Sequence, residues 1–183
     1  MIVLIGLPGS GKSTIGRQLS RRLSLPFSDS DQVIEQRLGC SIREFFEREG
    51  EDSFRDVEEA VLEELTQQSV GVLATGGGAV LRAANRRRMR DGGRVVYLRA
   101  RPEDLVRRLL NDRKRPLLQV ADPLQRLRDL YVARDPLYRE VAHFDIETGR
   151  SSTATLINKI LMQLELADGA PSGVDGAGSV SRR

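Results

Sequence analysis

The sequence contains no tryptophan, one cysteine (Cys40) and one histidine (His143). Because a disulfide needs two cysteines, we expect no internal disulfide and a reducing, cytoplasmic environment. One cysteine and one histidine also argue against a structural zinc site. Aromatic residues make up only 4% of the chain, which argues against a nucleic-acid-binding surface built on base stacking.

Long hydrophobic runs are also missing, since none approaches the roughly 20 residues of a membrane-spanning helix. No basic stretch precedes an apolar one at the N-terminus, so we expect no signal peptide. The 183 residues, 39% hydrophobic and 30% charged, suit one globular domain. From residue 168 the composition shifts to Gly, Ala and Ser. We therefore expect a domain at residues 1–167 and a disordered tail at 168–183.

The charge balance is nearly even, with 29 basic and 26 acidic residues and a net charge of +3. The basic residues are nearly all arginine, whose planar guanidinium suits bidentate contact with carboxylate and phosphate. A solvated surface would also account for this excess. With so few aromatics, we favour a small anionic ligand over nucleic acid.

The most specific motif lies in the first fourteen residues, MIVLIGLPGSGKST. Residues 2–5 form an apolar run typical of a buried strand, and residues 6–13 match G-x-x-x-x-G-K-[ST] at every fixed position. Such a loop turns its backbone N–H groups toward phosphate, and the helix that follows adds its positive N-terminal end. Lys12 can then reach the β- and γ-phosphates, and Ser13 can ligate Mg²⁺. The phosphate-binding residues that this pattern predicts are Gly9, Ser10, Gly11, Lys12, Ser13 and Thr14.

Short apolar runs alternate with helical patterns along the rest of the chain. We expect strands at residues 2–5, 26–28, 71–74, 95–98 and 143–146, and helices at 12–23, 33–38, 41–49, 53–68, 79–90, from 102, 123–134 and 152–166. Residues 111–122 are charged, interrupted by proline, and expected to be mobile. This alternation predicts an α/β fold with a parallel sheet, whose ligands bind at the carboxyl ends of the strands.

Two further loops at those strand ends carry chemistry. Asp29 and Asp31 lie two residues apart, so one carboxylate could bind Mg²⁺ and the other could accept a hydroxyl proton. Asp31 could instead only cap the helix from residue 33. The triple glycine at residues 76–78 indicates close approach of the backbone to a ligand, although a flexible turn would also use it.

Several basic residues occupy positions that could serve either binding or structure. Arg55 falls in the first turn of an expected helix, where a cation is unfavourable unless an anionic ligand or an ion pair with Glu58 compensates. Arg134 precedes a proline at an expected helix end, where a cation is favourable anyway. The basic residues 113–115 could form a cationic lid or a merely solvated cluster. His143, without an acidic neighbour in sequence, is expected to be structural.

Taken together, these motifs resemble the shikimate kinase family of P-loop, nucleoside-monophosphate-kinase-like proteins. The resemblance spans residues 2–166 and rests on GLPGSGKST, F-x-D-x-D at 27–31, F-R-x-x-E at 54–58, GGG at 76–78, R-P-L-L at 115–118 and R-x-x-x-Y at 134–138. It implies a three-layer α/β/α fold whose five-stranded parallel sheet has the order 2-3-1-4-5. It also implies a lid at about residues 109–122, a substrate-binding subdomain and a monomer.

The resemblance further implies transfer of the γ-phosphate of ATP to the 3-hydroxyl of shikimate, a step of chorismate and aromatic amino acid biosynthesis. The implied catalytic residues are Lys12, Asp31 and Arg115. Shikimate would be bound by Asp31, Arg55, Gly77, Gly78 and Arg134, with Phe46 and Phe54 walling its ring and the two arginines holding its carboxylate. Ser13 and Asp29 would hold Mg²⁺, and Arg108, Arg115 and Arg150 would contact the nucleotide.

Two other functions remain open. Gluconate kinase, or another small-molecule kinase of the same fold, would also need arginines for an anionic substrate, although GGG together with R-P-L-L favours shikimate. A non-catalytic nucleotide-binding module could bind nucleic acid through the arginine-rich residues 82–90, with binding that weakens strongly with salt.

Overall fold

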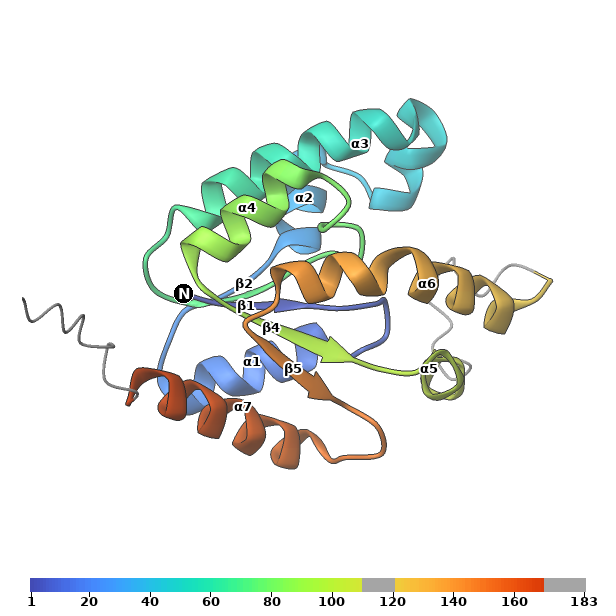
Figure 1. Ribbon diagram of the computed structural model, residues 1–183. Helices are drawn as coiled ribbons and strands as arrows, with labels where there is room; N and C mark the ends of the chain where they lie inside the picture. Colours follow the sequence, from blue (N-terminus) through green and yellow to red (C-terminus); the bar gives the residue numbers. More distant parts are fainter. Residues whose placement is uncertain (110–120, 170–183) are drawn as a thin grey trace, which may run out of the picture.

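The computed structural model describes residues 1–109 and 121–169, which form a sheet between two layers of helices (Figure 1). The strands are β1 (Ile2–Ile5), β2 (Phe27–Asp29), β3 (Val72–Ala74), β4 (Arg94–Arg99) and β5 (Phe144–Glu147). All neighbouring strands pair in parallel, in the order β2-β3-β1-β4-β5. The five-stranded sheet and its order are as the sequence predicts.

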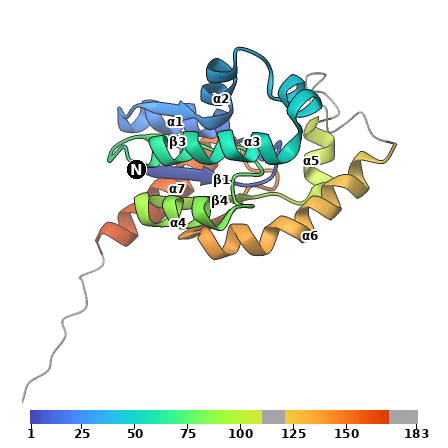
Figure 2. The ribbon, with the colours of Figure 1, turned by 90° about the horizontal axis from the view of Figure 1, so that it is seen from above.

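Helices cover both faces of the sheet. On one face lie α1 (Lys12–Leu23) and α7 (Thr153–Asp168), and on the other lie α2 (Ser30–Leu38), α3 (Ile42–Thr66), α4 (Ala83–Gly92) and α6 (Pro123–Val141). The short helix α5 (Pro102–Leu109) follows the carboxyl end of β4 (Figures 1 and 2). In the described part of the chain, no helix is both long and apolar enough to cross a membrane.

The two faces have separate hydrophobic cores because strand side chains alternate in direction. In β1, Val3 and Ile5 pack under α3 and α4, whereas Ile2 and Leu4 pack against α1 and α7. Burial on both faces accounts for the continuous apolar run at the start of the sequence.

Three helix boundaries differ from the expected ones by three residues or more. The helix predicted to end at residue 134 continues as α6 to Val141, although Pro136 lies inside it and cannot donate to the carbonyl of Val132. Both of these residues are exposed, so water can satisfy that carbonyl, while Tyr138 and Val141 bury the opposite side of the helix. Arg134 therefore lies in mid-helix, and the prediction that it sits at a helix end is wrong.

The helix predicted from residue 79 begins only at Ala83. The four preceding residues form a turn, in which the Ala79 N–H donates to the Gly76 carbonyl (3.2 Å) and the Leu81 N–H to the Gly78 carbonyl (3.0 Å). The glycine loop and its turn thus form one unit in front of α4.

The helix α2 begins at Ser30, three residues before the expected start. Its N-cap is Asp29, so the alternative in which Asp31 serves only as the cap is wrong.

The predicted break at Gly50 is confirmed inside α3, where this residue has φ 82° and ψ 177°. Because helical geometry resumes directly after this kink, Arg55 lies in the second turn of its helical segment. The helix-dipole argument for Arg55 is therefore weaker than the sequence indicated.

Candidate active site

The three loops singled out in the sequence meet at the carboxyl edge of the sheet. A side chain added at Gly76 would lie 2.6 Å from Asp31 Oδ1 and 3.1 Å from Glu58 Oε1. One added at Gly77 would lie 2.7 Å from Cδ of Pro8, in the phosphate-binding loop. This loop, the start of α2 and the middle of α3 therefore all pack against the triple glycine, where only hydrogen atoms fit.

The phosphate-binding loop ends in a left-handed turn at Gly11 (φ 96°), which caps α1 without any side-chain hydrogen bond. No side-chain cap therefore competes with a ligand anion at the N-terminus of α1. Lys12 is 8% exposed, and its Nζ donates to the carbonyls of Gly6 (2.8 Å) and Leu7 (2.9 Å), which places the ammonium group over the loop. The other predicted phosphate-binding residues, Gly9, Ser10, Ser13 and Thr14, occupy this turn and the first turn of α1.

Ser13 and Asp29 come together from α1 and β2. The Ser13 hydroxyl donates to Asp29 Oδ2 (2.6 Å), and Asp29 Oδ1 accepts the Asp31 N–H (3.1 Å). A hydroxyl and a carboxylate are hard oxygen ligands, so this pair fits Mg²⁺.

Asp31 lies next to this pair, between the phosphate loop and α3. Burial raises the pKa of its carboxyl group to about 6. The negative charges of Asp29 and Glu58 contribute to this rise in pKa, whereas the positive charge of Lys12 opposes it. A carboxyl group tuned in this way accepts a proton more readily than an ordinary aspartate.

Arg55 lies between two carboxylates and two aromatic rings. Its Nη1 donates to Glu58 (2.6 Å), and its Nε and Nη2 donate to Glu51 (3.3 and 2.9 Å). The guanidinium lies 5.2 Å from the ring centroid of Phe54 and 5.9 Å from that of Phe46. Two of its five N–H donors remain for a ligand.

Phe46 and Phe54 form an apolar wall beside this arginine. Their ring centroids are 4.5 Å apart, and the kink at Gly50 lies between them in sequence. The kink thus sets how the first segment of α3 meets the second.

Arg134 joins the same cluster from α6. It lowers the pKa of Glu58, and so does Arg55, although burial raises the pKa of this glutamate overall. Glu58 is only 1% exposed. Arg55 pairs directly with this buried carboxylate and Arg134 acts on it electrostatically, so the two arginines predicted to hold one ligand carboxylate both lie near Glu58.

Glu58 and Tyr138 are site residues that the sequence reasoning did not assign. The sequence predicts Glu58 only as an ion-pair partner of Arg55, and Tyr138 only as part of the R-x-x-x-Y motif. Tyr138 donates from its hydroxyl to the Gly77 carbonyl (2.6 Å). The sequence signal that could have identified them is their spacing in the family motifs, Glu58 three residues after Arg55 and Tyr138 four residues after Arg134.

At the other end of this edge, Arg108 of α5 contacts the loop after β5. Its guanidinium donates to the carbonyl of Gly149 and lies 3.5 Å from Thr148 Oγ1. Arg150, in the same loop, is exposed. Arg115 and most of the expected lid lie outside the described residues.

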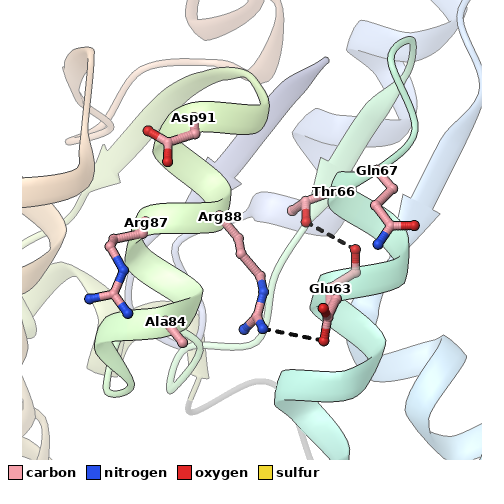
Figure 3. A pocket seen from close by; sticks show the side chains of 7 residues that line it. All are labelled: Glu63, Thr66, Gln67, Ala84, Arg87, Arg88 and Asp91. Atoms are coloured by element: carbon pink, nitrogen blue, oxygen red, sulfur yellow. Dashed lines mark hydrogen bonds and ion pairs between the residues drawn. The ribbon is translucent and has the colours of Figure 1, made fainter.

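The arginines between residues 82 and 90 are mostly engaged within the protein. Arg82 pairs with Asp56 and Glu59, Arg86 with Glu140, and Arg88 with Glu59 and Glu63. In the pocket of about 420 Å³ between α3 and α4, Arg88 reaches across to Glu63 while Arg87 points away (Figure 3). Paired charges of both signs here argue against a basic stripe for nucleic acid.

His143 contacts the backbone of the neighbouring strand. Its Nδ1 accepts the N–H of Val95 (3.0 Å), and burial, together with the charges of Arg90 and Arg94, lowers its pKa. The imidazole is therefore a neutral structural acceptor at the edge of the sheet.

Comparisons with known proteins show which family the chain resembles over most of its length. A family model described as shikimate kinase matches residues 8–165. The chain is similar to the shikimate kinase of Paracidovorax citrulli, with 62% identity over 169 residues, which cover 91% of this chain and 92% of that protein. It is also similar to a solved structure, the shikimate kinase from Acinetobacter baumannii in complex with shikimate, with a TM-score of 0.86, 49% identity, and coverage of 92% of this chain and 93% of that one.

A gluconokinase from Sinorhizobium meliloti 1021 has a similar structure, with a TM-score of 0.58, 16% identity and coverage of 91% of each chain. At this identity the similarity concerns the fold alone. The family-level similarity therefore favours shikimate kinase over gluconate kinase, the alternative that the sequence motifs left open.

Proposed function

This chain belongs to the shikimate kinase family, and we propose that the site at the carboxyl edge of its sheet carries out the family reaction. The reaction moves the γ-phosphoryl group of ATP to the 3-hydroxyl of shikimate and gives shikimate 3-phosphate and ADP. The observation that supports this site most directly is the packing of Asp31 and Glu58 against Gly76, next to the phosphate loop that carries Lys12.

On the nucleotide side, the loop N–H groups and Lys12 hold the β- and γ-phosphates. Ser13 and Asp29 would hold Mg²⁺, which, when bound, neutralises charge on the phosphates. Lys12 lies within reach because its ammonium group already rests on the loop carbonyls. Arg108 and Arg150 would flank the base, and Arg115 would contact the phosphates.

On the substrate side, Arg55 and Arg134 hold the carboxylate of shikimate, and Phe46 and Phe54 cover its ring. The N–H groups of Gly77 and Gly78 face its hydroxyls. Glu58 does not use all the N–H donors of the two guanidiniums. The remaining donors suit the negatively charged carboxylate of shikimate.

Asp31 orients the 3-hydroxyl and takes its proton as the phosphoryl group is transferred. A loose, highly charged transition state needs positioning and charge stabilisation more than a strong base. The pKa of about 6 leaves the carboxylate ionised at neutral pH and still able to accept a proton.

The remaining expectations are that the protein works in the cytoplasm as a monomer. The single cysteine, Cys40, is free and has no partner for an internal disulfide, which supports a reducing compartment.

Release of ADP with and without shikimate tests the proposal. We expect ADP release that depends on shikimate and Mg²⁺, no comparable stimulation by gluconate, and loss of turnover in Lys12→Ala with an unchanged circular dichroism spectrum. Turnover of gluconate without shikimate turnover would overturn the substrate assignment. Normal turnover in Lys12→Ala would instead overturn the role of the loop.

A further inference from the structure

Hydrogen bonds to its carbonyl groups fix the turn at residues 76–81. The acceptors and donors are Gly76 O with Ala79 N, Gly77 O with Tyr138 Oη, Gly78 O with Leu81 N, and Val80 O and Leu81 O with Arg86 Nη1. Only one of these donors is a buried side chain from a distant part of the chain. That donor is Tyr138 on α6.

Some N–H groups of the same loop have no hydrogen-bond partner in the described part of the chain, unlike the carbonyl groups of Gly76, Gly77 and Gly78. Gly76 donates to Ser30 Oγ (3.0 Å), but within the described residues the N–H groups of Gly77 and Gly78 have no hydrogen-bond partner. Gly78 is buried. Unpaired buried N–H groups are rare, so these two donors are available to a ligand.

Peptide planarity links the hydrogen bond at the Gly77 carbonyl to the direction of the Gly78 N–H. The Gly77 carbonyl and the Gly78 N–H belong to one trans peptide unit and point in opposite directions. When Tyr138 binds the Gly77 oxygen at 2.6 Å, the Gly78 N–H is therefore turned to the face of the loop away from Tyr138. Glycine would otherwise rotate this peptide easily, because it has no side chain to restrict φ and ψ.

Tyr138 is itself rigidly placed. It is 1% exposed, and its ring stacks on Tyr97 of β4 with centroids 4.9 Å apart and an interplanar angle of 26°. The Tyr97 hydroxyl donates instead to Asp135 of α6 (2.8 Å), not to the glycine loop. The Tyr138 hydroxyl therefore has a fixed position relative to the strands.

The same hydroxyl lies beside Arg134, one turn earlier on α6. Burial raises the pKa of Tyr138, so it remains a protonated donor, while the adjacent Arg134 opposes that rise. Tyr138 thus stands between the arginine and the glycine loop that are both expected to bind the substrate.

We propose that Tyr138 is a positioning residue for substrate binding, because its hydroxyl orients the Gly77–Gly78 peptide so that the Gly78 N–H faces the substrate hydroxyls. This inference rests on the proposed function of the site. Tyr138 acts through the loop backbone and does not itself contact the reacting atoms.

The kinetic test compares Tyr138→Phe with the matched control Tyr97→Phe. Each removes one hydroxyl from the same stacked pair, but only the first removes the bond to the loop. For Tyr138→Phe we expect the KM for shikimate to rise about tenfold, or about 1.4 kcal/mol, with the KM for ATP within about twofold of wild type. Tyr97→Phe should leave both constants within about twofold.

A rescue variant separates orientation from packing. Tyr138→4-aminophenylalanine keeps an N–H donor at the same ring position, and we expect it to recover most of the shikimate affinity. Equal loss in the Tyr138 and Tyr97 variants, or no change in Tyr138→Phe, would overturn the proposal.

An NMR measurement reads the peptide itself and does not depend on turnover. The ¹⁵N shift of Gly78, which responds to hydrogen bonding at the Gly77 carbonyl, should change in Tyr138→Phe and not in Tyr97→Phe. In wild type, the Gly78 amide should shift when shikimate is added. A wild-type Gly78 amide that is insensitive to bound shikimate would overturn the proposal even if a variant fails to fold, whereas absence of shikimate turnover would count against the proposed function.

Discussion

Asp31, the proposed proton acceptor, lowers the stability of the folded protein at neutral pH. Its carboxyl has a pKa of about 6, against an ordinary 3.8, because burial and the charges of Asp29 and Glu58 disfavour ionisation. Between these two values the folded protein binds more protons than the unfolded chain. The free energy of unfolding therefore falls as the pH rises through this interval.

Asp31→Asn should consequently stabilise the ligand-free protein at pH 8 by about 1–3 kcal/mol while abolishing phosphoryl transfer. Urea unfolding in buffer with EDTA measures the gain. The gain should shrink as the pH falls from 6 to 4, because the wild-type carboxyl is then protonated in the folded state. An equal gain at pH 4 and pH 8 would mean that packing, not charge, is responsible.

Arg55 provides a second prediction at this scale. Arg55→Ala should raise the KM for shikimate by about thirtyfold to a thousandfold, or about 2–4 kcal/mol, because a bound carboxylate would lose a charged donor. The KM for ATP should change little. Steady-state kinetics with each substrate varied in turn measure the difference.

Two variants control for the packing role of Arg55 beside Glu58. Arg55→Lys keeps the positive charge but loses the planar fork, and it should show an intermediate loss. Arg43→Ala removes an exposed arginine that pairs with Glu47 on the same helix, and it should leave both constants unchanged. Normal shikimate affinity in Arg55→Ala would exclude the proposed carboxylate site.

Among the elements, α3 is the one whose shape bears most directly on the site. Its kink at Gly50 has a backbone conformation that only glycine adopts readily, and nothing lies within 4 Å of a side chain added there. The kink separates Phe46 from Phe54 in sequence, and their rings nevertheless pack in a tilted arrangement with centroids 4.5 Å apart. Substitution at this glycine therefore changes backbone geometry without creating a clash.

Gly50→Ala should lower stability by about 1–3 kcal/mol and should also raise the KM for shikimate more than the KM for ATP. Gly39→Ala is the matched control, since Gly39 also has a positive φ (68°) and open space around it, but it ends α2 and lies outside α3, the helix that carries Phe46 and Phe54. Thermal melts measure the stability of both variants, and steady-state kinetics measure their KM values for shikimate and ATP. If both lower the melting temperature and neither changes the shikimate KM, the kink has no role in substrate binding.

On the scale of the whole molecule, the described residues already contain a complete sheet and two cores. The last helix, α7, ends at Asp168, and the Gly169 N–H closes it by donating to the Glu165 carbonyl (2.9 Å). The large hydrophobic side chains exposed in the described part of the chain are Val70, Leu81, Val132, Met162 and Leu166, which lie on separate segments except for the last two. They give no broad apolar patch for self-association.

Removing residues 170–183 should therefore leave the melting temperature within about 2 °C and the turnover unchanged, because their composition offers little to bury. Light scattering of the full chain and the truncated chain should give monomer masses for both. A large loss of stability on truncation would show that these residues dock on the domain, and a dimer of the full chain alone would assign them to self-association.

Much of the fold followed from local patterns. The apolar run before a glycine-rich loop, the alternation of strands with helices and the break at Gly50 each depend on residues close together in sequence, where side-chain period and backbone preference act directly. Local patterns also misplaced the end of α6, because the burial of Tyr138 and Val141 outweighs the hydrogen bond lost at Pro136.

The sequence by itself determined the phosphate-loop motif and, through the family motifs, the order of the sheet, whereas the ligand-binding residues that it named stay predictions. Only the tertiary structure decided that Arg134 comes close enough to act electrostatically on Glu58, the ion-pair partner of Arg55, and that Tyr138 binds a carbonyl 61 residues away. Contacts of that kind depend on how α3 and α6 pack over the sheet. Packing is set by the fit of many side chains at once, which no spacing within a single motif encodes.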